Sequence, residues 1–168
     1  MPTPRVTPLP TTRVPAPSEW HGVMPIRVRY VECDAMGFAH HSAYLPWLEM
    51  GRTELLRQVG VTYAQLEAAG VLLVVTQMEL KYRRPARYDD VLSLTTRVTR
   101  ATRVKIEHAY ELRVSERGGG QPHALTAEDI ALMQDTGEDL LFTGASTIAC
   151  IGRDGRPAPL PEWLAGRA

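Results

Sequence analysis

The chain has 168 residues, a length typical of a single domain. Hydrophobic residues make up 44% and charged residues 23%, values near the globular average that exclude a wholly disordered chain. The 19 basic and 19 acidic side chains balance, so we expect no nucleic-acid partner, which would need a basic surplus. No apolar run approaches the roughly 18 residues of a membrane span, so we expect no such segment.

Residues 1–19 hold six of the 13 prolines and show no periodicity. This composition predicts a flexible extension ahead of one domain at residues 20–168. The extension lacks the continuous apolar core of a secretory signal. The two cysteines, Cys33 and Cys150, are too few for a disulfide framework. Both features favour a cytoplasmic protein.

The first predicted strand is marked by Ile26, Val28 and Tyr30, which alternate with more polar neighbours. A loop follows, because the next ten residues contain Gly37 and have no clear period. The sequence therefore predicts a loop that joins this strand to the next element, which begins near residue 42.

A long helix is predicted next, with Ser42 as its N-cap and Gly60 at its end. Gly51 lies inside the apolar pattern at a cost of about 1 kcal/mol against Ala, which indicates close contact of the helix with a sheet. Thr62 and Gln65 form a capping box for a short second helix.

The rest of the chain alternates or is rich in β-branched residues, which predicts strands at 71–84, 91–99, 104–114, 123–134 and 141–151. The connections are of turn length, so the sheet should be antiparallel. We therefore expect an α+β fold in which a curved sheet of five to six strands wraps around one long helix. The uncovered face or edge of this sheet favours a second subunit.

The densest group of reactive side chains lies in the loop and at the helix start: Glu32, Cys33, Asp34, His40, His41, Ser42 and Tyr44. The free N–H groups and the dipole of a helix N-terminus stabilise negative charge. An oxyanion that develops on an acyl group would therefore be stabilised there. Asp34 could attack the carbonyl or activate a water molecule for the attack.

The segment YVECDAMGFAHHSAYLPWLEMGRTELLR resembles the signature of hotdog-fold acyl-CoA thioesterases of the 4-hydroxybenzoyl-CoA thioesterase type. The matching residues are Tyr30, Cys33, Asp34, Gly37, His41, Tyr44, Leu45, Glu49 and Arg52. The resemblance continues in QMELKYRRPARYDDVLSLTTRV, read as a central strand pair, and in RPAPLPEWL. It covers about residues 22–164.

The resemblance implies a hotdog fold and hydrolysis of an acyl-CoA thioester to a carboxylate and free CoA. It implies that Asp34 is the nucleophile or general base and that the backbone amide near His41 donates to the oxyanion. It also implies homodimers or dimers of dimers, and we expect a homotetramer. Coenzyme A is then part of the substrate, and no separate cofactor is expected.

Gly37 and Tyr44 fall at positions that the resemblance places beside the substrate. The phosphates of CoA call for basic side chains, and Arg suits phosphate because its planar fork donates two hydrogen bonds. We expect these contacts from the cluster Arg100, Arg103 and Lys105, in preference to a second cluster, Arg83, Arg84 and Arg87.

Several residues have alternative interpretations. Glu49 is kept as a second candidate for the catalytic carboxylate, the other interpretation being a buried hydrogen bond or a salt bridge with Arg52. Cys33 as nucleophile ranks low because no base is fixed beside it. A metal site is not expected, since the candidate ligands in the loop lie too close together in sequence for a tetrahedral zinc site. His108 lies on the apolar face of a strand and is predicted to be a core or interface histidine with its hydrogen bonds satisfied.

Two other functions compete with thioester hydrolysis. One is a hotdog hydratase or dehydratase that acts on acyl thioesters, but such enzymes use a His with an acid in a different pattern. The other is a non-catalytic acyl-CoA binding protein. The chain offers no second domain to transmit a binding signal, so hydrolysis is the preferred prediction.

Overall fold

The computed structural model describes residues 16–119 and 139–165. Within them, five antiparallel strands form one sheet in the order β1-β3-β4-β5-β2. The strands are β1 (His21–Arg27), β2 (Leu72–Tyr82), β3 (Val91–Ala101), β4 (Lys105–Glu116) and β5 (Leu140–Ile151). The predicted strand at 123–134 lies outside the described residues.

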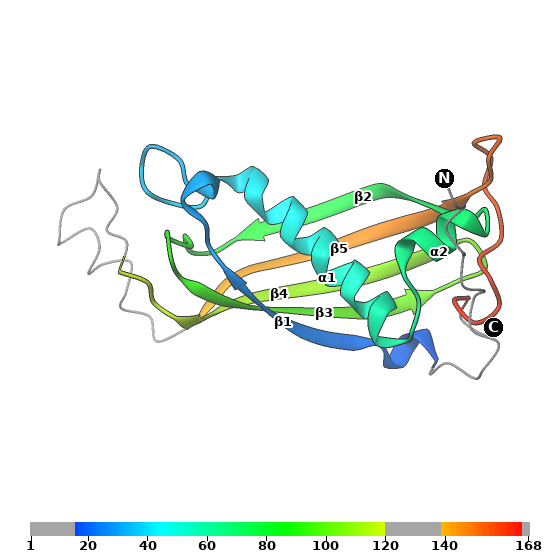
Figure 1. The fold of residues 1–168 in the computed structure, drawn as a ribbon, viewed down its shortest axis with the longest axis horizontal. Helices are drawn as coiled ribbons and strands as arrows, with labels where there is room; N and C mark the ends of the chain where they lie inside the picture. The colour runs from blue at the N-terminus through cyan, green and yellow to red at the C-terminus, as the bar shows by residue number, and fades with distance from the viewer. Residues whose placement is uncertain (1–15, 120–138, 166–168) are drawn as a thin grey trace, which may run out of the picture.

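Helix α1 (Tyr44–Gln58) lies along one face of the curved sheet, and α2 (Tyr63–Ala68) follows near its end (Figure 1). The predicted α+β architecture, a curved sheet around one long helix, is confirmed. No helix in the described part of the chain is both long and apolar enough to cross a bilayer.

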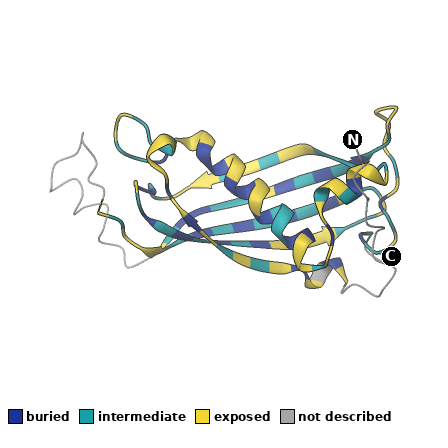
Figure 2. Cartoon of the chain, in the orientation of Figure 1, coloured by how far each residue is buried: buried dark blue, intermediate teal, exposed yellow. Residues whose placement is uncertain are grey.

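The packing of α1 on the sheet depends on Gly51. A Cβ atom at this position would collide with Oγ1 of Thr96 on β3 and would lie 3.0 Å from Cδ2 of Leu94. The predicted close contact of helix and sheet is therefore confirmed. Buried and partly exposed residues alternate along β3 and β4 (Figure 2), so their inward rows pack beneath the helix.

Two apolar clusters fill the space between α1 and the sheet. One surrounds the first half of α1, where Trp47 and Leu48 are buried. The other surrounds its second half, where Leu55 and Leu56 are buried. The C-terminal segment closes the second cluster, with Trp163 stacked on Trp20 at a ring-centroid distance of 6.3 Å.

The ends of two predicted elements were wrong. The first strand ends at Arg27, and Tyr30 instead begins a 3₁₀ turn, Tyr30–Glu32, with 75% of its surface exposed. Ser42 does not cap the helix. A 3₁₀ turn at His41–Ala43 precedes α1, and the Nδ1 atom of His40 accepts the N–H of Ser42.

The expected central strand pair was also wrong, because β2 lies at the edge of the sheet and pairs only with β5, whereas β3 lies between β1 and β4. Between β2 and β3 the chain passes from one edge of the sheet to a position next to the other edge. No local sequence pattern predicts this change of position. Strand β2 carries a bulge at Thr76, and the neighbouring Val75 is 50% exposed.

Candidate active site

Asp34 lies in a tight loop between the 3₁₀ turn Tyr30–Glu32 and α1. Cys33 pairs with Ala39 as an isolated antiparallel bridge, and the N–H of Asp34 donates to the carbonyl of Phe38 at 2.8 Å. Gly37 makes the reversal with φ at 83°, a conformation that favours glycine. The loop therefore holds Asp34 at a fixed place just ahead of the helix.

The Asp34 carboxylate is oriented by backbone donors. Its Oδ1 atom accepts the N–H of Met36 at 2.9 Å and the N–H of Phe38 at 3.4 Å. Its Oδ2 atom accepts no hydrogen bond from the residues that the structure describes. One oxygen is thus held and the other is available to a reacting group, as a general base or nucleophile requires.

Among the residues that the structure describes, the 3₁₀ turn at His41–Ala43 has one backbone N–H without an acceptor. The N–H of Ser42 is taken by His40 Nδ1 at 3.3 Å, and the N–H of Ala43 is taken by the His40 carbonyl at 2.8 Å. His41 begins the turn, so its N–H has no acceptor within the helix. The geometry thus leaves the amide of His41, the predicted oxyanion donor, unoccupied.

Two side chains for which the sequence predicted no role, Glu32 in the reactive group and Tyr82 outside it, hold this region together. Glu32 accepts the indole N–H of Trp47 at 2.9 Å and a guanidinium N–H of Arg29 at 2.8 Å. Tyr82 on β2 donates its hydroxyl to the carbonyl of His41 at 3.2 Å. The alternation of β2 could have placed Tyr82 on the inner face, but no local signal predicts the bond between Glu32 and Trp47.

Cys33 is a poor nucleophile in this setting. Burial raises the pKa of its thiol, and the carboxylates of Glu32, Asp34 and Asp90 raise it further. The thiol therefore stays protonated at neutral pH, whereas the thiolate is the reactive form.

Tyr44 packs beneath the site. Only 2% of its surface is exposed, and its ring lies against Trp47, Tyr82 and Phe142 with centroids 4.9 to 5.2 Å away. Burial raises the pKa of its hydroxyl to about 12. The structure shows this packing role, and contact of Tyr44 with substrate stays a prediction.

Glu49 lies on α1 farther from the loop, with its side chain exposed. The salt bridge to Arg52 is absent from the described structure, where Arg52 donates to the hydroxyl of Tyr110 at 3.1 Å. Glu49 and Arg52 both line a cavity of about 210 Å³ between the second half of α1 and the sheet. Glu49 is therefore separated from the Asp34 carboxylate along the helix and remains the second candidate.

The two basic clusters lie at opposite ends of β3. The loop of Asp34 contacts the chain just before β3, through a bridge between Phe38 and Arg87. Arg100 is at the other end, and at about 3.3 Å per residue the intervening strand spans roughly 30 Å. Within one chain, the predicted group Arg100, Arg103 and Lys105 is thus remote from Asp34, whereas the Arg83–Arg87 group is near it (Figure 1).

Solved structures with the same architecture include thioesterases. A DHNA-CoA thioesterase from Staphylococcus aureus superimposes with a TM-score of 0.65 over 83% of this chain and 79% of that one, at 24% identity. A 4-hydroxybenzoyl-CoA thioesterase superimposes with a TM-score of 0.66 over 85% of this chain and 94% of that one, at 16% identity. At these identities the likeness shows the fold alone, and the fold is the hotdog fold of that class.

The sequence comparisons define the family. The model of the thioesterase-like superfamily matches residues 28–167, and the chain belongs to this superfamily. A hypothetical protein from Thermus thermophilus is 31% identical, with a TM-score of 0.66 over 84% of this chain and 92% of that one. The acyl-CoA thioester hydrolase YbgC of Escherichia coli is 40% identical over 75 residues, which are 45% of this chain and 56% of that protein. The match to YneP of Bacillus subtilis covers 63% of that protein, so the chain spans less than two thirds of these curated relatives.

Proposed function

We propose that the protein is an acyl-CoA thioesterase in which Asp34 activates the attack on the thioester carbonyl. The observation that carries the proposal is the Asp34 carboxylate ahead of α1, with Oδ1 held by two backbone N–H groups and Oδ2 without a hydrogen bond from the described residues. The name of YbgC, an acyl-CoA thioester hydrolase, supports the same reaction.

The reaction adds water across the thioester and gives a carboxylic acid and the free thiol of CoA. Asp34 either removes a proton from the attacking water or attacks the carbonyl itself to form an anhydride that water then opens. In both routes, negative charge develops on the carbonyl oxygen, and the N–H of His41 would donate a hydrogen bond to stabilise it. The intermediate then expels the CoA thiolate, which takes up a proton.

A homo-oligomer is part of the proposal. Strand β2 is an edge strand of 11 residues, whereas the opposite edge, β1, has seven residues and contains Pro25, which cannot donate to a ladder. Pairing of β2 with β2 of a second copy would continue the sheet into a dimer, and two dimers would form a tetramer. A cytoplasmic location agrees with the two free cysteines.

The proposed CoA contacts follow from the positions of the basic clusters. If Arg100, Arg103 and Lys105 hold the phosphates at the Asp34 site, they come from another copy, because one chain separates them by the length of β3. The Arg83–Arg87 group can serve within the same chain. Replacing each group with Gln distinguishes them, since only the group that binds phosphate should raise KM for acyl-CoA.

Release of free thiol from short, medium, long and aromatic acyl-CoAs tests the reaction. The Asn side chain of Asp34→Asn can keep the turn but cannot act as a base, so kcat should fall about 10²–10⁴-fold. Asp154→Asn is the matched control, because Asp154 also accepts a backbone N–H two residues on, from Arg156 at 3.1 Å, and lies far along the chain.

Unchanged turnover in Asp34→Asn would remove Asp34 from the mechanism. If the wild type releases no thiol from any ester, titration with a non-hydrolysable acyl-CoA separates the remaining functions. Binding without turnover would identify a non-catalytic acyl-CoA binding protein.

A further inference from the structure

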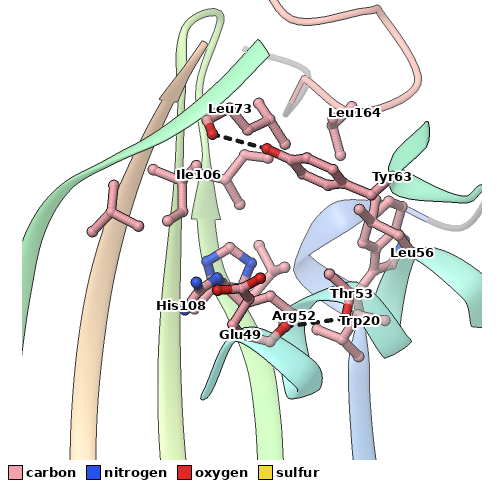
Figure 3. Close-up of a pocket in the computed structure, with 14 residues that line it drawn as sticks. Trp20, Glu49, Arg52, Thr53, Leu56, Tyr63, Leu73, Ile106, His108 and Leu164 are labelled. Atoms are coloured by element: carbon pink, nitrogen blue, oxygen red, sulfur yellow. Dashed lines mark hydrogen bonds between the residues drawn. The ribbon is translucent and has the colours of Figure 1, made fainter. Parts of the chain in front are cut away.

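The cavity of about 210 Å³ is walled mainly by aliphatic side chains and does not include Asp34. Its lining comes from the second half of α1, from β2, β3, β4 and β5, and from the C-terminal segment (Figure 3). At about 1.5 Å per residue, the lining residues of α1 lie from roughly 7 Å (Glu49) to roughly 18 Å (Leu56) along the helix axis from Tyr44. The cavity therefore extends away from the loop of Asp34 along the helix.

His108 is the buried polar residue on the cavity wall. It is 7% exposed, which agrees with the predicted core position, and its Nδ1 atom is buried without a hydrogen-bond partner among the described residues of this chain. The prediction that its hydrogen bonds are satisfied therefore does not hold within the described part of one chain. Burial, followed by the positive charge of Arg52, lowers the pKa of the imidazole to about 3, so the ring is neutral at physiological pH.

The neighbouring polar groups are already paired among themselves. Arg52 donates to the hydroxyl of Tyr110 at 3.1 Å, and that hydroxyl shares a hydrogen bond of 2.6 Å with Ser146. None of these groups reaches the Nδ1 atom of His108. A buried nitrogen without a partner is costly, and such groups in proteins are normally satisfied by a ligand, an ion or a water molecule.

We propose that this cavity is a binding site for a compact apolar group that carries one neutral hydrogen-bonding substituent, with His108 as the partner of that substituent. An apolar cavity of about 150 Å³ holds a benzene ring, so the volume here suits a group of six to eight non-hydrogen atoms. Glu49 and Arg52 bring opposite charges to the same cavity, and the imidazole of His108 is neutral. A neutral hydroxyl or carbonyl therefore fits better than an ion.

The bound group can come from two sources with the same chemistry. It can be a free small molecule, or it can be the acyl part of a thioester substrate. The second source rests on the proposed function, whereas the first does not. A binding measurement without turnover tests the site itself, and a kinetic comparison then identifies the source.

Cyclohexanol and methylcyclohexane are suitable probes, because they have the same shape and differ by a hydroxyl in place of a methyl group. Titration followed by the NMR shifts of the Ile106, Ile148 and Leu164 methyl groups gives both dissociation constants. In His108→Leu, the preference for cyclohexanol relative to methylcyclohexane should fall about fivefold to tenfold, the range expected for one neutral hydrogen bond.

Two further variants keep the test decisive. His21→Leu makes the same replacement at an exposed histidine on β1 and should leave both dissociation constants unchanged. Val75→Phe fills the cavity from a half-exposed position that tolerates a larger side chain, and it should weaken both probes. The proposal is overturned if neither probe binds the wild type, or if His108→Leu leaves the preference unchanged.

The source of the bound group, a free molecule or the acyl part of a substrate, follows from a kinetic ratio. This is the ratio of kcat/KM for 6-hydroxyhexanoyl-CoA to kcat/KM for hexanoyl-CoA. A drop in this ratio in His108→Leu would show that the acyl part enters the cavity. An unchanged ratio, with cyclohexanol still bound by the wild type, would show that the cavity takes a separate ligand. If the protein hydrolyses no thioester, the probe titration still decides whether the site exists.

Discussion

Trp47 donates its indole N–H to Oε1 of Glu32 at 2.9 Å, which ties the segment before the Asp34 loop to the buried face of α1. Glu32 also accepts the backbone N–H of Arg29 at 2.8 Å and a guanidinium N–H from the same residue. Burial alone would raise the pKa of Glu32, but these hydrogen bonds from Arg29 and Trp47 outweigh it and lower the pKa. Glu32 is thus a charged anchor for the region that carries Asp34.

Replacing Glu32 by Gln should lower the free energy of unfolding by about 1–3 kcal/mol at pH 7, because charge-assisted hydrogen bonds to a mostly buried side chain become weaker. Urea unfolding measures the change. The deficit should shrink as the pH falls through the lowered pKa of Glu32, since protonation removes the same charge from the wild type. Glu54→Gln is the control, because its ion pair with Arg57 is exposed and should contribute under 0.5 kcal/mol.

Gly51→Ala should destabilise the protein although alanine is the better helix former. The helix preference alone favours Ala by about 1 kcal/mol. The added Cβ would collide with Oγ1 of Thr96, and such overpacking costs about 1–3 kcal/mol. Thermal unfolding checks the sign, and Thr96→Ala in the same chain should relieve the collision. A higher Tm for Gly51→Ala alone would contradict the close contact.

Thr96→Val should stabilise the protein by about 1 kcal/mol. The Oγ1 atom of Thr96 is buried without a hydrogen-bond partner, and a methyl group in its place removes that cost. The Tm should rise by a few degrees in a domain of this size. Thr76→Val provides the contrast, because the Thr76 hydroxyl donates to the carbonyl of Thr147 at 3.0 Å. This variant should therefore be no more stable than the wild type.

His108 should make the wild type less stable in mild acid. Its pKa is about 3 in the folded chain against an ordinary 6.5, so between these values the unfolded chain binds more protons and stability falls as the pH falls. At pH 5 this loss is about 2 kcal/mol relative to pH 7. His108→Leu should lack it, and urea unfolding of both proteins at the two pH values gives the difference. Parallel pH profiles would show that His108 is not buried in its neutral form.

The elements that the sequence predicted well are those fixed by neighbouring residues. The capping box of Thr62 and Gln65 forms, and Gly60 follows the end of α1 with φ at 82°. The cap at His40 was missed because an imidazole nitrogen, in place of the Ser42 hydroxyl, accepts a backbone N–H, that of Ser42, in the 3₁₀ turn ahead of α1. The edge position of β2 was missed because strand order depends on contacts distant in sequence.

The roles of the candidate site residues stay predictions. The described loop carries Asp34, and His41 begins the 3₁₀ turn that follows this loop. Alternation placed His108 on the inner face of β4, but a pattern of side chains cannot show whether a buried ring finds a partner. The separation of the two basic clusters did have a signal, because they flank the two ends of one predicted strand, 91–99.

The bulge at Thr76 also bears on the behaviour of the protein in concentrated solution. A long and regular edge strand is a template for unrelated chains and for fibres. The bulge interrupts the ladder near the middle of β2, and Glu79 and Lys81 place charges along the same edge. The bulge and these charges therefore disfavour uncontrolled strand addition along β2 in newly made chains.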